Sequence, residues 1–140
     1  MNVENLGVCV RNNSVAVLNW YEFSQNNSGG RFHVNQRVCH RLFIEAVDAD
    51  DATRIAESLG VYFHGVDDGI DCECCGDRWY YPNSVKFPLE YTKGTVFHNI
   101  EEYAQHLANA YGWTTPDVRI FYKNSIVKEI FKQETSVPTQ

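Results

Sequence analysis

The chain has 140 residues, of which 44% are hydrophobic and 21% charged, and its formal net charge is -6. This length suits one domain that buries roughly two-thirds of its unfolded surface, so stability alone requires neither a disulfide nor a metal. No apolar run approaches the ~20 residues that cross a bilayer, and the first residues do not resemble a secretory signal. The acidic balance disfavours duplex nucleic acid. We therefore expect a cytoplasmic protein whose partners include neither a membrane nor a duplex.

The N-terminal residues predict a β-hairpin. Residues 7–10 and 14–23 are rich in β-branched, aromatic and leucine residues, and they flank a polar turn at residues 11–13. Residues 26–30, Asn-Asn-Ser-Gly-Gly, follow as a loop. This loop could cradle an anion with free N–H groups, or it could be a plain hairpin connection.

A strand and a helix are predicted next. The composition of residues 32–47 is typical of a strand, and apolar side chains alternate with their neighbours over residues 42–46. Asp48 and Asp50 are candidate caps for a helix that would stop at Gly60.

A second strand and helix are predicted near the C-terminus. Asn99 and Glu102 form a capping pattern ahead of the longest apolar stripe in the chain, and Gly112 would end that helix. Residues 118–123 alternate as a strand. Residues 125–132 indicate a short final helix.

These elements predict an α+β fold, with a small antiparallel or mixed sheet, two main helices packed on it and a Cys-containing irregular loop. We expect a single globular domain over residues 1–132 and a flexible tail over residues 133–140. Residues 65–88 have no clear period, and long irregular segments of compact domains are commonly functional or tied by a metal.

The five cysteines indicate reduced thiols, because the number is odd and two of them are adjacent. Cys72 and Cys75 have the C-x-x-C spacing of a zinc knuckle, and Gly76 can adopt the left-handed conformation that such turns use. Two other interpretations stay open: buried structural thiols, or a thiol nucleophile paired with a histidine. The other zinc ligands would be Cys39 and His40, or Cys74, His64 or Cys9.

A cation lies beside aromatic residues in the segment Arg78-Trp79-Tyr80-Tyr81. An arginine and aromatic rings can grip a phosphate and stack on a base. The alternative is structural: the rings would close a core at a sheet edge while Arg78 pairs with a neighbouring aspartate. The carboxylates that could serve a metal-dependent nuclease, or belong to a solvated turn, are Asp67, Asp68, Asp71 and Asp77.

Several segments together resemble a family of small uncharacterised proteins of tailed bacteriophages that share a Cys-x-Cys-Cys-Gly-Asp-Arg-Trp core. The resemblance implies a phage protein acting in the host cell cytoplasm, and it implies no particular chemistry. The segments that carry it are residues 26–30, 39–41, 69–79 and 111–117. The residues it marks are Cys39, His40, Arg41, Cys72, Cys74, Cys75, Asp77, Arg78 and Trp79.

The sequence favours a small non-catalytic binding protein, and we assign no catalytic residue. It would act as a host-defence antagonist that sequesters a nucleotide signal or a host protein; homo-oligomerisation stays open. The alternatives are a zinc-stabilised interaction module and a thiol- or metal-dependent enzyme. The predicted ligand-binding residues are Arg41, Asp77, Arg78, Trp79 and Tyr80. The predicted zinc ligands are Cys39, His40, Cys72 and Cys75.

Overall fold

A computed structural model describes residues 8–11 and 14–133. Its helices are α1 (Ala49–Leu59) and α2 (Ile100–Tyr111), with short 3-10 turns η2 (Ser28–Gly30) and η3 (Thr92–Gly94). Its strands are β1 (Val8–Arg11), β2 (Ser14–Val17), β3 (Asn19–Ser24), β4 (Arg41–Ala46), β5 (Asn83–Val85), β6 (Leu89–Glu90), β7 (Val96–Phe97), β8 (Val118–Phe121) and β9 (Val127–Ile130).

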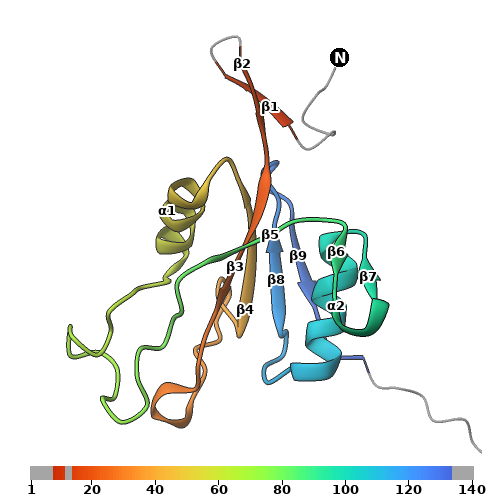
Figure 1. Ribbon diagram of the computed structural model, residues 1–140. Coiled ribbons are helices and arrows are strands. Elements are labelled where there is room, and N and C mark those ends of the chain that lie inside the picture. Colours follow the sequence, from red (N-terminus) through yellow and green to blue (C-terminus); the bar gives the residue numbers. More distant parts are fainter. Residues whose placement is uncertain (1–7, 12–13, 134–140) are drawn as a thin grey trace, which may run out of the picture.

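A mixed sheet forms the centre of the molecule, in the order β5-β3-β4-β8-β9. β4 and β8 pair in parallel, and the other neighbours pair antiparallel. α1 and α2 lie on opposite sides of this sheet (Figure 1). Two small antiparallel pairs, β1-β2 and β6-β7, stand outside it. The predicted α+β fold with a mixed sheet and two helices is therefore confirmed.

The side chains of β4 point alternately to the two faces of the sheet and contribute to two separate cores. Leu42, Ile44 and Ala46 belong to the cluster that includes the buried alanines of α1. Phe43 points the other way, into a cluster with α2 and β8. Since successive side chains of a strand face opposite sides of the sheet, this buried central strand supplies both cores.

Both helices begin where their caps predict. The Asp48 carboxylate accepts the N–H of Asp51 at 2.8 Å ahead of α1. The Asn99 side chain accepts the N–H of Glu102 at 3.0 Å ahead of α2, and Glu102 in turn accepts the N–H of His98. Of the helices in the described ranges, neither is long and apolar enough to cross a membrane.

The final predicted helix is wrong, because residues 127–130 form the edge strand β9. The chain reverses at Ser125, whose φ is 75°, and the N–H of Tyr122 donates to the carbonyl of Ile126 at 2.9 Å. This tight turn returns the chain along β8, where pairing outweighs the helical spacing of the apolar residues.

The strand predicted over residues 32–47 is shorter than expected, since β4 begins only at Arg41. Ahead of it, the Asn35 side chain accepts the N–H groups of Arg37 and Val38, which makes a turn instead of an extended ladder. The N-terminal hairpin is confirmed as β1-β2. Its predicted second strand is divided, because the chain from Asn19 onward joins the central sheet as β3. Residues 7, 12 and 13 of that prediction lie outside the described residues.

Candidate metal centre

A long connection, residues 61–82, leads from α1 to β5 as a series of turns. Tyr62 and Gly65 hold its first part close to Asp71: the Tyr62 hydroxyl donates to Asp71 Oδ1 at 2.8 Å. A Cβ atom at Gly65 would lie 1.9 Å from Asp71 Oδ2, so only glycine fits there. The N–H groups of Ile70 and Asp71 donate to the Gly65 carbonyl at 2.7 and 2.9 Å. This arrangement fixes the start of the cysteine turn.

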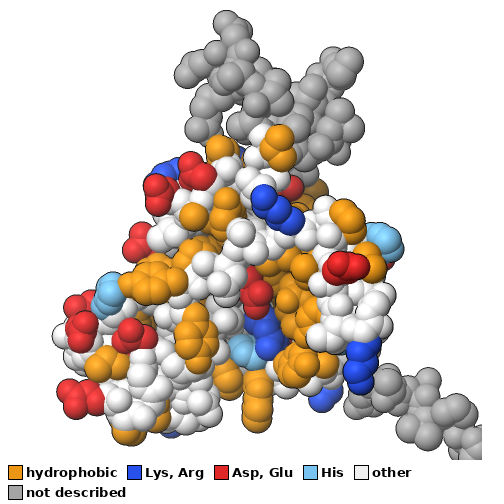
Figure 2. All heavy atoms as spheres, viewed as in Figure 1, with side chains coloured by type: hydrophobic (Ala, Val, Ile, Leu, Met, Phe, Trp, Pro, Cys, Tyr) orange, Lys and Arg blue, Asp and Glu red, His pale blue; other side chains and the backbone are white. Residues whose placement is uncertain are grey.

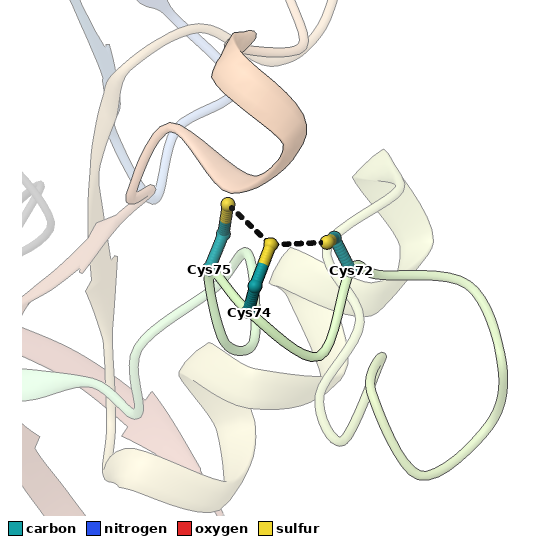
Figure 3. A group of neighbouring side chains, drawn as sticks. All are labelled: Cys72, Cys74 and Cys75. Atoms are coloured by element: carbon teal, nitrogen blue, oxygen red, sulfur yellow. Dashed lines mark hydrogen bonds between the residues drawn. The ribbon is translucent and has the colours of Figure 1, made fainter.

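The cysteine turn spans residues 72–76. The N–H groups of Cys75 and Gly76 both donate to the Cys72 carbonyl, at 3.2 and 3.0 Å. Gly76 has a φ of 85°, which a side chain would strain. The Cys72–Cys74 and Cys74–Cys75 sulfur distances are 2.7 and 3.5 Å. Figure 3 shows the three sulfurs on the same side of this turn.

Cys72 and Cys74 differ in acidity, although both side chains are exposed. The pKa of Cys72 is lowered, first by the hydrogen bond from the Cys74 thiol and then by the backbone N–H groups of Cys74 and Cys75. Hydrogen bonds to its two neighbours raise the pKa of Cys74 to about 11. Cys72 therefore forms a thiolate more readily than Cys74, and a cation would offset the charge of a thiolate at Cys74.

The geometry suits a soft metal ion. All three sulfurs lie within 4.8 Å of one another, so this group could hold a metal. Zn–S bonds of about 2.3 Å in tetrahedral geometry place sulfurs about 3.8 Å apart, a spacing close to the 3.5 Å between the Cys74 and Cys75 sulfurs. Three thiolates would leave one coordination position for another ligand.

Two of the predicted zinc ligands join this group, and two do not. Cys72 and Cys75 are brought together, with Cys74 between them. Cys39 is buried, its thiol donates to the Arg41 carbonyl at 3.4 Å, and burial raises its pKa to about 12. His40 Nδ1 lies 2.8 Å from Asp117 Oδ1.

Of the alternative ligands named from the sequence, Cys74 joins the thiol group and His64 does not. His64 Nε2 pairs with the Tyr81 hydroxyl at 2.6 Å. The side chain of Cys9 lies outside the described residues. Cys39 fits the structural interpretation of a buried thiol, whereas the exposed Cys72, Cys74 and Cys75 do not.

The predicted ligand-binding residues do not form one surface. Arg78 is buried, and each nitrogen of its guanidinium donates to a neighbour, among them the Ser28 carbonyl at 2.9 Å and the Arg31 carbonyl. Trp79 is 2% exposed and belongs to the α1-side core. Asp77 accepts the N–H of Val66 at 2.9 Å. Tyr80 is 53% exposed.

Arg78 joins the cysteine turn to the loop of residues 26–31. The N–H of Asn26 donates to the Arg78 carbonyl at 2.8 Å, and the Ser28 hydroxyl donates to the Gly76 carbonyl at 3.0 Å. The Asn26 side chain also donates to the Asp77 carbonyl. The 26–30 loop therefore braces the thiol turn, and Ser28 is buried in that contact.

Arg41 lies in a different place, beside Asp117. Arg41 Nη1 lies 2.7 Å from Asp117 Oδ2, and the N–H groups of Trp113 and Thr114 donate to Asp117 Oδ1. Asp117 is fully buried. Its pKa is lowered, because the His40 hydrogen bond and the other donors outweigh the large opposing effect of burial. Sequence reasoning missed Asp117 because two of its four donors, His40 and Arg41, are more than 70 residues away in the chain.

Comparison with known protein families gives a match over most of the chain. A family model described as a domain of unknown function, DUF7296, matches residues 18–133. The chain belongs to this family. The DUF7296 match contains the central sheet, both helices and the cysteine turn, and it leaves out β1 and β2. No curated protein and no solved structure matches the chain.

Proposed function

We propose that the protein is a non-catalytic binding protein whose working element is a zinc site at Cys72, Cys74 and Cys75. The observation that carries this proposal is the grouping of three thiols within 4.8 Å in one short turn. Thiolates select soft or borderline ions such as zinc or Cu(I). Hydrogen bonds to Cys72 and Cys75 raise the pKa of Cys74, and zinc binding would favour its deprotonated form.

The metal would organise a surface and not a core, since the three thiols are exposed. Large apolar side chains lie exposed in and beside the same connection: Ile70 is 61%, Tyr80 53% and Tyr81 62% exposed. Tyrosines presented by a rigid backbone are typical of protein interfaces. We infer that the connection, held by zinc near its middle, binds a protein partner.

The resemblance to small phage proteins supports a role in an infected cell. We propose that the partner is a host protein and that sequestering it antagonises a host defence. Arg78 and Trp79 would support this surface from the interior, while Tyr80 and Tyr81 would contact the partner. The proposed nucleotide ligand would lie elsewhere, at Arg41, because the Arg78 guanidinium has its donors committed inside the protein.

Competition for zinc with a chromophoric chelator tests the site. Cys74→Ser should weaken zinc binding by roughly 100-fold or more, since even substitutions outside the ligand shell cost 10–100-fold. Cys39→Ala is the matched control, because Cys39 is buried and outside the thiol group. An equal loss in both variants, or no stoichiometric zinc in the unaltered protein, would overturn the proposal.

A further inference from the structure

Glu22 and Arg41 face each other on the α2 side of the sheet without a hydrogen bond between them. Arg41 Nε lies 3.9 Å from Glu22 Oε2, beyond hydrogen-bond distance. Arg41 Nη1 is engaged with Asp117 at 2.7 Å and with the Tyr111 carbonyl at 3.5 Å. Within the described part of the chain, Nε and Nη2 of Arg41 and the Glu22 carboxylate form no hydrogen bond. Both side chains therefore keep hydrogen-bonding atoms available.

Glu22 is the surplus charge of this group. Asp117 already balances Arg41 at short distance, and it is completely buried. The Glu22 side chain is only 17% exposed, and this burial raises its pKa despite the opposing effect of Arg41. A carboxylate that is desolvated and lacks donors gains the most from a ligand that brings N–H groups.

Tyrosine rings lie beside the two charges. Tyr103 comes from α2, and its pKa is raised to about 12 by burial and then by the nearby Glu22. The pKa of Tyr91 is raised, first by the neighbouring Tyr111 side chain and then by burial, and the charges of Arg41 and Glu22 also reach it. Figure 2 shows a hollow in the middle of this face, where acidic, basic and histidine side chains lie among hydrophobic ones. The surroundings thus combine polar recognition atoms with aromatic faces.

We infer that Glu22, Arg41 and the tyrosines beside them form a binding site for the base of a guanine nucleotide. Guanine presents two neighbouring donors, the ring N–H and the amino group, which match the two oxygens of one carboxylate. Its O6 and N7 acceptors follow along the edge, and they match the two donors of an arginine. Stacking on tyrosine would add affinity for the flat base. Adenine presents its N6 amino donor beside the N1 acceptor, so it offers the buried carboxylate one donor and sets a lone pair against the other oxygen.

This site rests on the non-catalytic binding role proposed above, but it does not involve the metal. The thiol group and the Glu22–Arg41 pair share no residue, and the hydrogen bonds of the Arg41 side chain go to Tyr111 and Asp117 and to none of the three thiols. Failure of one site is therefore distinguishable from failure of the other, because zinc stoichiometry and nucleotide binding are measured separately.

Isothermal titration of the full chain with GMP, guanosine, AMP, CMP and UMP tests the inference. We expect GMP and guanosine to bind, and the three other nucleotides to bind at least about tenfold more weakly. Glu22→Gln should weaken GMP binding at least about tenfold, because an amide presents a donor where guanine also has one. Glu57→Gln, an exposed change on α1 across the sheet, should leave it unchanged.

The outcomes decide the inference in either direction. Absence of binding by all five compounds, or AMP binding as tightly as GMP, would overturn it. An unchanged affinity in Glu22→Gln would do the same. Tyr111→Ala provides a second variant at a side chain that is 51% exposed, so it tests stacking without opening the core. Cys74→Ser should bind GMP as the unaltered protein does.

Discussion

Asp71 and Arg78 form a buried pair that closes the base of the cysteine turn. Arg78 Nε lies 3.8 Å from Asp71 Oδ1, and the Arg78 N–H donates to Asp71 Oδ2 at 2.8 Å. The side chain of Arg78 is 7% exposed, and that of Asp71 is 1% exposed. Since residues 71 and 78 bracket the thiols, this pair holds both ends of the turn at a fixed separation. Arg78 therefore serves the metal centre as its support.

Arg78→Ala should destabilise the fold strongly. The change leaves the Asp71 carboxylate buried without its charge partner, which typically costs about 3–5 kcal/mol. Urea unfolding measures the loss. The control is Arg54→Ala. Arg54 forms an ion pair with Asp51, but the Arg54 side chain is 72% exposed. Solvent-exposed ion pairs contribute about 0–1 kcal/mol to stability. Similar losses in the two variants would show that Arg78 is not a structural anchor.

Zinc should raise the melting temperature, and a chelator should reverse the rise. Free zinc at about 100 times its dissociation constant stabilises a folded site by about 2.7 kcal/mol. For a domain of this size that corresponds to a rise of roughly 10 °C. Calorimetry with and without EDTA measures it, and the Cys74→Ser variant should show a much smaller response. A chelator-insensitive melting temperature would argue against a metal that supports the turn.

Glu22→Gln should stabilise the protein at neutral pH while it weakens the proposed ligand site. Burial raises the folded pKa of Glu22 above its unfolded value. Protonated Glu22 therefore favours the folded state at low pH, and this contribution is lost as the pH rises through the folded pKa. The gain from the amide should appear above that pKa and vanish in acid. Urea midpoints of both proteins across this range measure it; a loss of stability at pH 7 would contradict it.

Asp117 should make the protein sensitive to acid. Its folded pKa is lowered, with the His40 hydrogen bond as the largest lowering influence. Its stabilisation is present above the unfolded pKa of about 3.9 and is lost as the pH falls through the folded value. Asp117→Asn should cost about 3–5 kcal/mol at neutral pH, because it removes the hydrogen-bonded counter-charge of the buried Arg41 and leaves only Glu22, 3.9 Å away.

The cost of Asp117→Asn should shrink as the pH falls. Urea unfolding at pH 7 and in acid compares the variant with the unaltered protein, and Asp50→Asn, on an exposed position of α1, is the control. A pH-independent difference between the proteins would show that the Asp117 charge does not contribute to stability.

Local signals in the sequence predicted a large part of the fold. Asp48 and Asn99 cap the two helices because a capping side chain bonds to an N–H three residues away, a contact that the sequence itself specifies. The C-x-x-C-G spacing likewise specifies the turn that gathers Cys72, Cys74 and Cys75.

Contacts between distant segments escaped prediction. Whether Arg78 faces the solvent or the interior depends on carbonyls at residues 28 and 31, which only the tertiary fold brings near. The ligands proposed at Cys39 and His40 failed to join the thiols for a similar reason: the sheet places both residues in other contacts. β9 was predicted as a helix because pairing with β8 cannot be read from its apolar spacing.

Native mass spectrometry of the protein purified under reducing conditions with zinc supplied tests the central claim most directly. The thiol site predicts an excess mass of one zinc per chain in the unaltered protein and in Cys39→Ala. It predicts loss of that zinc when Cys72, Cys74 and Cys75 are all replaced by serine. A bare unaltered protein, or zinc retained by the triple variant, would contradict the account.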